Sequence, residues 1–208
     1  FNNKVVLVTG GTGSFGKKFV KKLLNDFNCK KIVIFSRDEL KQFELRGSLS
    51  KHKRAKSLRF FLGDIRDKSR LLTALNNVDY VVHCAALKQI EAAEYNSQEC
   101  VKTNIIGTQN VIEGCIDKNV KKVISLSTDK AVDPINLYGA TKLAADKLTI
   151  SSNLISVHKD TIFSVVRYGN VINSRGSVIP FFKSLLKEKS KFIPLTHSEM
   201  TRFFISLE

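Results

Sequence analysis

The feature that most constrains the fold of this chain is a glycine-rich turn near its N-terminus. Glycines stand at positions 10, 11, 13 and 16. Before the turn, residues 4–8 form a short apolar run rich in β-branched side chains, which predicts a buried strand. After it, apolar residues recur every three to four positions over residues 15–24, with lysines on the other face, which predicts a helix.

The same alternation continues along the chain. Strand patterns recur at residues 31–35, 58–62, 78–84, 120–126 and 161–166. Helical patterns lie between them at residues 38–49, 68–75, 97–115 and 138–152. Six alternating units predict an α/β fold with a doubly wound parallel sheet.

The C-terminal stretch departs from this pattern. Residues 1–168 hold all six units, whereas residues 169–208 end in an apolar stretch that carries no stop signal. We predict that residues 1–168 form a nucleotide-binding domain. Residues 169–208 would then start a substrate-binding region that is truncated here.

Composition narrows the class of protein. The chain has 208 residues, 43% of them hydrophobic, and 34 Lys and Arg against 19 Asp and Glu, a formal charge of +15. This composition excludes disorder throughout the chain. No apolar run reaches the roughly 18 to 20 residues that a membrane-crossing helix needs, and the first residues lack the layout of a secretion signal. We therefore expect a cytoplasmic protein.

The positive charge raises the question of nucleic acid, because Lys and Arg side chains along phosphates release counterions. The charges are spread along the chain, and the densest run, residues 51–54, is short and contains no aromatic side chain. A solvated loop or helix end is therefore favoured over a nucleic-acid-binding patch. A small anionic ligand is a competing explanation of the charge.

Cysteine and histidine spacing gives no indication of a metal site. The four cysteines, at positions 29, 84, 100 and 115, form no CxxC pair, and three lie in apolar segments. This predicts reduced thiols that pack as small hydrophobes. The four histidines have no spacing that would close a tetrahedral site, so we expect no metal.

The glycine turn has the chemistry of a phosphate-binding loop. Glycine lets the backbone adopt positive φ and approach a pyrophosphate, and the N-terminus of the following helix attracts negative charge. A GxGxxG match alone is weak, but the strand before it and the helix after it favour a dinucleotide site over a merely tight turn. The residues expected to contact the dinucleotide are Gly10, Thr12, Gly13, Ser14, Phe15 and Gly16.

The end of the second strand predicts which dinucleotide is bound. An acidic residue there would bond the ribose hydroxyls of NAD, whereas this chain has Ser36, Arg37 and Asp38. The Arg37 fork suits a 2′-phosphate and Lys41 lies one helical turn on, so we predict NADP as the cofactor. The alternative is that Arg37 is a surface charge paired with Asp38 or Glu39.

Asp64 and Ile65 follow the third strand. The Asp64 carboxylate is placed to cap the next helix or to accept a hydrogen bond from the adenine amine, and the two roles are compatible. We predict both residues as cofactor contacts.

Tyr138 and Lys142 are the first candidates for chemistry. They stand at i and i+4, so on a helix both side chains lie on one face. The ammonium would lower the pKa of the phenol toward neutrality and contact the cofactor ribose, which gives a base for the proton of an alcohol. A lone YxxxK is more often a surface pair, but together with the glycine loop the catalytic interpretation is favoured.

These motifs and their neighbours resemble a known family. The similarity runs in order through TGGTGSFGKKFV, FSRDELKQ, RFFLGDIRD, AALK, AEYN, STDKAVDPINLYGATK, SVVRYGNVINSRGSVIPFF and MTRF. The chain resembles the extended short-chain dehydrogenase/reductases, and among them the soluble, C5-inverting UDP-N-acetylglucosamine 4,6-dehydratases of bacterial glycan biosynthesis. The resemblance implies a Rossmann-like fold and assembly into homo-oligomers, with no nucleic acid or membrane partner. Membrane-anchored relatives carry Met where this chain has Tyr138.

The resemblance also implies a reaction. NADP+ would take a hydride from carbon 4 of the sugar while Tyr138, assisted by Lys142 and Thr128, removes the hydroxyl proton. Lys130 would then act as the base at carbon 5 and Asp129 as the acid on the departing hydroxyl of carbon 6. A lysine needs a depressed pKa for that role. The alternative for Asp129 and Lys130 is a solvated ion pair after a strand.

Further contacts follow from the resemblance alone. The implied cofactor contacts are Cys84, Lys88, Leu126, Ser127, Tyr138, Lys142, Val171, Ser174 and Arg175, and the implied substrate contacts are Lys88, Asn170, Val178 and Thr196. Two positions depart from the family pattern: Cys84 is commonly alanine in relatives and Asn173 is commonly glycine.

Two other functions stay open at this stage. A sugar-nucleotide epimerase or a retaining 4,6-dehydratase would share Tyr138 and Lys142, and an epimerase would not need Lys130. A noncatalytic nucleic-acid-binding protein that uses the positive charge is the more distant alternative.

Overall fold

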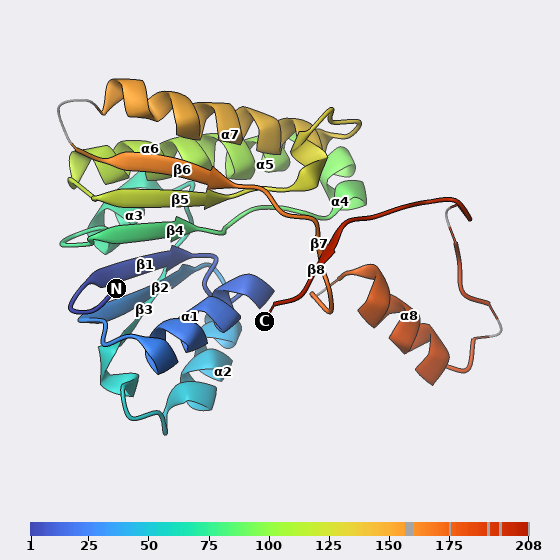
Figure 1. The fold of residues 1–208 in the computed structure, drawn as a ribbon, viewed down its shortest axis with the longest axis horizontal. Coiled ribbons are helices and arrows are strands. Elements are labelled where there is room, and N and C mark those ends of the chain that lie inside the picture. The colour runs from blue at the N-terminus through green and yellow to red at the C-terminus, as the bar shows by residue number, and fades with distance from the viewer. Residues whose placement is uncertain (157–159, 175, 191, 196, 208) are drawn as a thin grey trace.

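The computed structural model describes residues 1–156, 160–174, 176–190, 192–195 and 197–207. Six strands form one parallel sheet in the order β3-β2-β1-β4-β5-β6 (Figure 1). The strands are β1 (Val5–Thr9), β2 (Lys31–Ser36), β3 (Leu58–Leu62), β4 (Tyr80–His83), β5 (Lys122–Leu126) and β6 (Ile162–Val166). The predicted doubly wound α/β fold is therefore confirmed.

Helices cover the sheet on both faces (Figure 1). Their bounds are α1 (Ser14–Asp26), α2 (Glu39–Leu49), α3 (Lys68–Ala74), α4 (Ile90–Tyr95), α5 (Ser97–Val101), α6 (Gly107–Asp117) and α7 (Leu137–Ile155). Strand residues alternate between two cores: Val6, Val8 and Ile32 face α1 and α2, whereas Leu7 and Val33 face α3 and α6. The continuous apolar runs of β1 and β2 follow from this burial on both faces.

The segment predicted as one helix over residues 97–115 is divided. A π-helical turn, η2 (Lys102–Ile106), separates α5 from α6. The sequence pattern missed this turn because one extra residue in a turn barely disturbs a helical period. It also missed the short α4 and the 3₁₀ turn η3 (Asp129–Ala131).

The C-terminal stretch lies beyond the carboxyl ends of the strands (Figure 1). It contains β7 (Asn170–Val171), α8 (Val178–Lys187) and β8 (Phe204–Ile205), and β7 pairs with β8 in parallel. No residue of α8 is buried in the part of the chain described here. That residues 169–208 begin a separate substrate-binding region stays a prediction.

The basic run over residues 51–54 belongs to the loop between α2 and the 3₁₀ turn η1 (Ala55–Ser57). Arg54 Nη1 donates to the carbonyl oxygens of Leu24 and Asn25 at 2.7 and 3.0 Å, so its side chain caps the C-terminal end of α1.

In the described residues, no helix is both long and apolar enough to cross a bilayer.

Candidate active site

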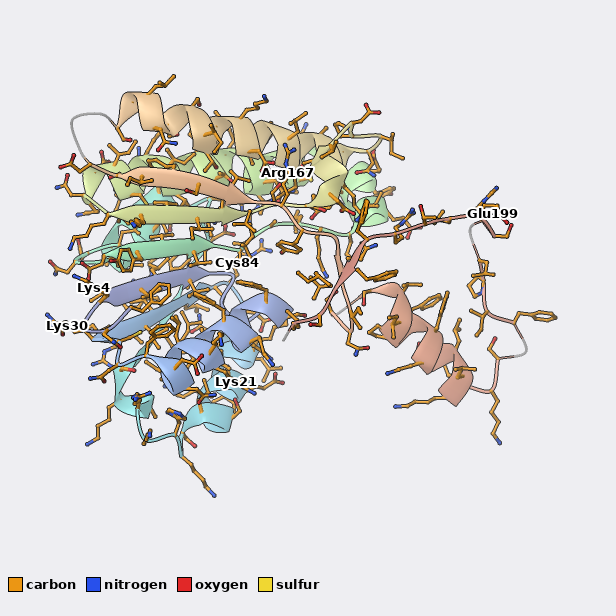
Figure 2. The ribbon with its side chains drawn as sticks, viewed as in Figure 1. Lys4, Lys21, Lys30, Cys84, Arg167 and Glu199 are labelled. Atoms are coloured by element: carbon orange, nitrogen blue, oxygen red, sulfur yellow. The ribbon has the colours of Figure 1, made fainter. Side chains whose placement is uncertain are left out.

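A cavity of ≈ 1630 Å³ runs along the carboxyl ends of the strands. Its walls come from the glycine loop, the ends of β2 and β3, the segment after β4, the start of α7 and the C-terminal stretch. Cys84, directly after β4, lies on this wall beside the glycine loop (Figure 2). Open parallel sheets place ligands at this edge.

Two positions of the glycine loop have no space for a side chain. Gly10 has φ +63°, and a Cβ there would lie 2.9 Å from Ala85 Cα. A Cβ on Gly16 would lie 2.6 Å from Gly11 Cα, so α1 meets the loop without room for a side chain. The first turn of α1 carries no acidic residue, and its N-cap, Gly13, supplies no capping side chain. The helix N-terminus is therefore suited to an anion.

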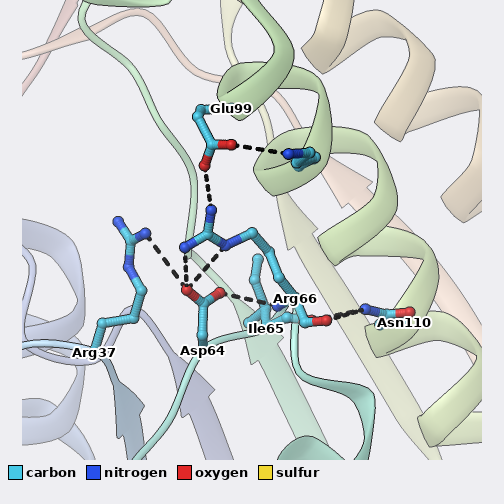
Figure 3. A network of polar contacts seen from close by, with 7 residues as sticks. Arg37, Asp64, Ile65, Arg66, Glu99 and Asn110 are labelled. Atoms are coloured by element: carbon cyan, nitrogen blue, oxygen red, sulfur yellow. Dashed lines mark hydrogen bonds and ion pairs between the residues drawn. The ribbon is translucent and has the colours of Figure 1, made fainter. Parts of the chain in front are cut away.

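A charged network joins the end of β2 to α5 beside the cavity (Figure 3). Arg66 donates from Nε and Nη2 to Asp64 Oδ2 at 2.9 and 2.7 Å, while Arg37 Nη1 lies 3.5 Å from the same oxygen. Glu99 pairs with Arg66 and accepts from Lys102 Nζ at 3.1 Å. Burial alone would raise the pKa of Asp64, but the bonds from Arg66 and the charge of Arg37 hold it below its usual range.

This network corrects two predictions. Arg37 pairs with Asp64 rather than with Asp38 or Glu39, because the ends of β2 and β3 are neighbours in the sheet. Asp64 does not cap the next helix: Asp67 caps α3 by accepting from the Arg70 amide at 2.9 Å. The Asp64 carboxylate is instead bonded to the amide and guanidinium of Arg66.

The other residues predicted at the end of β2 are also internally bonded. Asp38 caps α2 by accepting from the Lys41 amide at 2.9 Å, and its second oxygen pairs with Lys41 Nζ. Gln42, which the sequence reasoning missed, is buried and donates from Nε2 to Ser36 Oγ at 3.0 Å and to the Phe61 carbonyl at 2.9 Å. Gln42 therefore fixes the side chain of Ser36, the last residue of β2.

The candidate catalytic residues after β5 form one network. Lys130 Nζ donates to Asp129 Oδ1 at 3.0 Å and to Asn170 Oδ1 at 2.9 Å. Thr128 Oγ1 donates to Asp129 Oδ1 at 3.0 Å and is also hydrogen-bonded to the Tyr138 phenol. Burial would raise the pKa of Asp129, but the bonds from Lys130 and Thr128 outweigh it and hold the pKa below its usual range.

That Lys142 lowers the pKa of Tyr138 stays a prediction. Burial raises the pKa of Tyr138 above its ordinary value, and the Thr128 hydrogen bond offsets only part of this. Lys142, 6% exposed, donates from Nζ to the Leu126 carbonyl at 2.6 Å. Burial lowers the pKa of Lys142, opposed by the negative charge of Asp146 and by Cys84.

The structure brings most of the predicted site residues to one cavity. Those on its walls are Gly10, Thr12, Gly13, Ser14, Phe15, Gly16, Ser36, Arg37, Asp38, Lys41, Asp64, Ile65, Cys84, Lys88, Thr128, Lys130, Tyr138, Asn170, Val171, Ser174 and Val178. Leu126, Ser127, Asp129 and Lys142 lie directly behind the wall, bonded to residues at the end of β5 or to α7. Arg175 and Thr196 lie outside the described residues.

Thr103 and Tyr168 are two of the wall residues that were not predicted as contacts. Thr103, in the π-helical turn, is 3% exposed, and within the described part of the chain its hydroxyl has no hydrogen-bond partner. Tyr168 follows β6, and burial raises the pKa of its phenol to about 12. The strand-end position of Tyr168 is a signal that could have found it, whereas the helical period around Thr103 carries none.

Comparison with known proteins agrees with this geometry. The family model described as "Polysaccharide biosynthesis protein" matches residues 6–208. A UDP-N-acetylglucosamine 4,6-dehydratase (inverting) of Campylobacter jejuni is 57% identical over the whole chain, and a UDP-glucose 4-epimerase of Rickettsia bellii is 45% identical, also over the whole chain. The chain spans 61% and 60% of the lengths of these two relatives.

Solved structures show the same likeness. The X-ray structure of Pen from Bacillus thuringiensis superimposes with a TM-score of 0.95 at 43% identity, covering 100% of this chain and 64% of that one. The resemblance to the extended short-chain dehydrogenase/reductases is thereby confirmed. With a match that extends over residues 6–208, this chain belongs to the polysaccharide biosynthesis protein family.

Proposed function

We propose that the full-length protein is an NADP-dependent UDP-N-acetylglucosamine 4,6-dehydratase that inverts carbon 5. The observation that carries the proposal is the single network of Tyr138, Thr128, Asp129, Lys130 and Asn170 at the cavity. Had these side chains lain on separate surfaces, no site for the reaction would exist. Identity of 57% to the inverting dehydratase of Campylobacter jejuni supports the same reaction.

The residues present fit a dinucleotide. The glycine loop leaves no space for side chains at Gly10 and Gly16, and the buried Thr103 hydroxyl is an unpaired polar group on the same cavity wall. Arg37 is half exposed there, and its 3.5 Å contact with Asp64 is long enough to yield to a 2′-phosphate. When bound, the nicotinamide would take up the hydride from carbon 4 and return it to carbon 6.

Oxidation at carbon 4 needs a base for the hydroxyl proton. Tyr138 would accept this proton, and Thr128, already bonded to the phenol, would hold the sugar oxygen. Because burial raises the pKa of Tyr138, the proposal requires a positive charge near the phenol. Lys142, one turn further along α7, is the candidate for that charge.

Elimination needs a base at carbon 5 and an acid at the hydroxyl of carbon 6. Lys130 and Asp129 are hydrogen-bonded at 3.0 Å, and the pKa of Asp129 is held below its usual range. The lowered pKa of Asp129 favours the ion pair in the free protein, so the proposal requires that the bound sugar exclude water and that one proton then pass from Lys130 Nζ to Asp129 Oδ1, which creates a neutral amine and a carboxylic acid at once. The amine then removes the proton of carbon 5, the acid protonates the departing hydroxyl, and water leaves.

The experiment is incubation of the full-length protein with UDP-N-acetylglucosamine in heavy water. We expect a product lighter than the substrate by one water, with deuterium at carbon 5 in the inverted configuration, read by mass spectrometry and proton NMR. A product of unchanged mass contradicts the proposal.

A second candidate function is epimerisation at carbon 4, favoured by the 45% identity to a UDP-glucose 4-epimerase of Rickettsia bellii. An epimerase uses Tyr138 and Lys142 but has no elimination step, so it does not need Lys130. The variant Lys130→Ala therefore separates the two: it abolishes loss of water in a dehydratase and leaves epimerisation intact.

The predicted cytoplasmic location, homo-oligomeric state and lack of a nucleic-acid partner belong to the proposal of a dehydratase.

A further inference from the structure

Polar side chains dock α7 on the sheet. Among its buried residues, Lys142, Asp146 and Thr149 bond to residues on or directly after β5 and β6, whereas Thr141 bonds to Asn104 of η2 and Ser152 to the Leu148 carbonyl within α7. Thr149 Oγ1 lies within hydrogen-bonding distance, 3.3 Å, of Ser125 Oγ on β5. Hydrogen bonds are directional, whereas apolar contacts tolerate sliding, so these links fix both the rotation and the register of the helix.

Asp146 is the charged member of this buried face. Its side chain is 7% exposed, and Oδ2 accepts from Ser127 Oγ and from Arg167 Nε, both at 2.8 Å. Ser127 directly follows β5, and Arg167 directly follows β6, beside α7 (Figure 2). One carboxylate oxygen therefore joins α7 to the carboxyl ends of two neighbouring strands.

Asp146 lies one helical turn from Lys142, which lies one turn from Tyr138. Tyr138, Lys142 and Asp146 are spaced by four residues, so the three side chains follow one another along the same side of α7. Lys142 Nζ bonds the Leu126 carbonyl and Asp146 bonds the Ser127 hydroxyl, so two successive turns of the helix hold two successive residues of the chain. The next residues along that chain are Thr128, Asp129 and Lys130.

We propose that Asp146 is a positioning residue: it fixes α7 on the ends of β5 and β6, so that the Tyr138 phenol stays in register with Thr128. The inference rests on the proposed function and deepens it. Asp146 is not among the described residues that line the cavity, so it acts through Tyr138 and Lys142. Its negative charge also opposes the lowering of the Lys142 pKa by burial.

The test uses Asp146→Asn in the full-length enzyme. The amide keeps the shape and one acceptor for Ser127 but removes the charge that faces Arg167. We expect kcat per mole of folded protein to fall by about 10- to 100-fold with KM changed less than about twofold, because a small misplacement impairs the reacting geometry more than binding. Ser127→Ala, which removes only the link to β5, gives a smaller loss in the same direction.

A kinetic isotope effect separates positioning from loss of folded protein. The isotope effect on kcat, measured with substrate deuterated at carbon 4, does not depend on how much of the enzyme is folded. If Asp146→Asn slows proton and hydride transfer, its isotope effect is equal to or larger than that of the wild type. The matched control is Asn153→Ala, two turns further from the site, because the Asn153 side chain links α7 to β6: Nδ2 donates to the Phe163 carbonyl at 3.0 Å and Oδ1 accepts from the Phe163 amide at 2.9 Å. We expect this control to lower Tm and to leave kcat per folded enzyme unchanged.

The outcomes are distinct. If Asp146→Asn keeps kcat per folded enzyme within about twofold of the wild type, as Asn153→Ala is expected to, the positioning role is overturned and the proposed function stands. If the wild-type protein removes no water from the sugar, the proposed function itself fails.

Discussion

The two helices that border the candidate site, α1 and α7, dock on the sheet in opposite ways. α1 buries Val20, Leu23 and Leu24 behind the glycine loop, whereas α7 buries charged and hydroxyl side chains. The backbone at the N-terminus of α1 is the expected ligand contact, so apolar packing and a close glycine contact are enough to place it. The side chains of α7 carry the proposed chemistry, so its rotation has to be fixed by directional bonds.

The largest effect that would test this comparison is on α1. Leu23 is fully buried in the core between α1 and the sheet. We expect Leu23→Ala to lower the free energy of unfolding by about 2–5 kcal/mol, because it removes apolar contacts and leaves a cavity. Urea unfolding measures the change, with the exposed Lys21→Ala on the same helix as the control. A loss below about 1 kcal/mol would show that apolar packing does not hold α1.

The next largest effect is on the pH dependence of stability, and it concerns β4, the strand between β1 and β5. His83 on β4 is fully buried between Thr9 of β1, at 2.7 Å, and Thr108 of α6, at 3.1 Å. Burial, assisted by the charge of Lys142, lowers the pKa of His83 from 6.5 to about 3. Below pH 6.5 the unfolded chain therefore binds a proton that the folded chain does not, so stability is lost as pH falls.

Between the unfolded and folded pKa values of His83, this one group lowers the free energy of unfolding by up to about 1.4 kcal/mol for each unit that the pH falls. Urea unfolding at a series of pH values from 7 downward, roughly half a unit apart, measures it. In His83→Asn the slope should be smaller by this amount. Equal slopes in the two proteins would contradict a neutral His83 in the folded state.

On α7 the expected loss is smaller. Thr149 is fully buried and its hydroxyl bonds the Ala145 carbonyl at 2.8 Å as well as Ser125. Thr149→Val keeps the shape but leaves the serine hydroxyl without this partner, so we expect a loss of about 1–2 kcal/mol. The control is Thr73→Val on the exposed face of α3, where the change should be near zero. Equal losses of stability for Thr149→Val and Thr73→Val would show that the buried hydroxyl bond of Thr149 does not help to hold α7, and the contrast with α1 would fail.

The smallest effect concerns the surface of α1. Lys22 Nζ lies 2.7 Å from Asp26 Oδ2, with the two side chains 66% and 42% exposed. We expect Asp26→Asn to change the free energy of unfolding by no more than about 0.5 kcal/mol, because exposed ion pairs gain little in water. Thermal unfolding at low and high salt checks this. A larger, salt-dependent loss would mean that charge pairs also hold α1.

Much of the fold could be predicted because its signals are local. The six strands of the main sheet and the helices that bury an apolar stripe, such as α1, were predicted from short-range periodicity, whereas β7 and β8 were not. The π-helical turn around Thr103 was missed because it inserts into a helix without changing which residues are apolar. The glycine loop was predicted because its steric requirement is written in four glycines within seven residues.

Charge partners could not be predicted in the same way. Arg37 was expected to meet a phosphate or else to pair with Asp38 or Glu39; its protein partner is Asp64, a neighbour only because β2 and β3 pair, and its contact with a phosphate stays a prediction. Lys142 was expected to act on Tyr138, and the structure adds that its ammonium bonds the Leu126 carbonyl, because a buried cation takes the acceptor that the fold presents.

The sequence by itself determined the alternation of strands and helices, the phosphate-loop backbone and the order of Thr128, Asp129, Lys130, Tyr138 and Lys142 along the chain. Only the tertiary structure decided which charges neutralise one another and how α7 is held. The reason is physical: backbone conformation depends on near neighbours, whereas electrostatic pairing and pKa depend on burial and on residues that pairing of distant strands brings within a few ångströms.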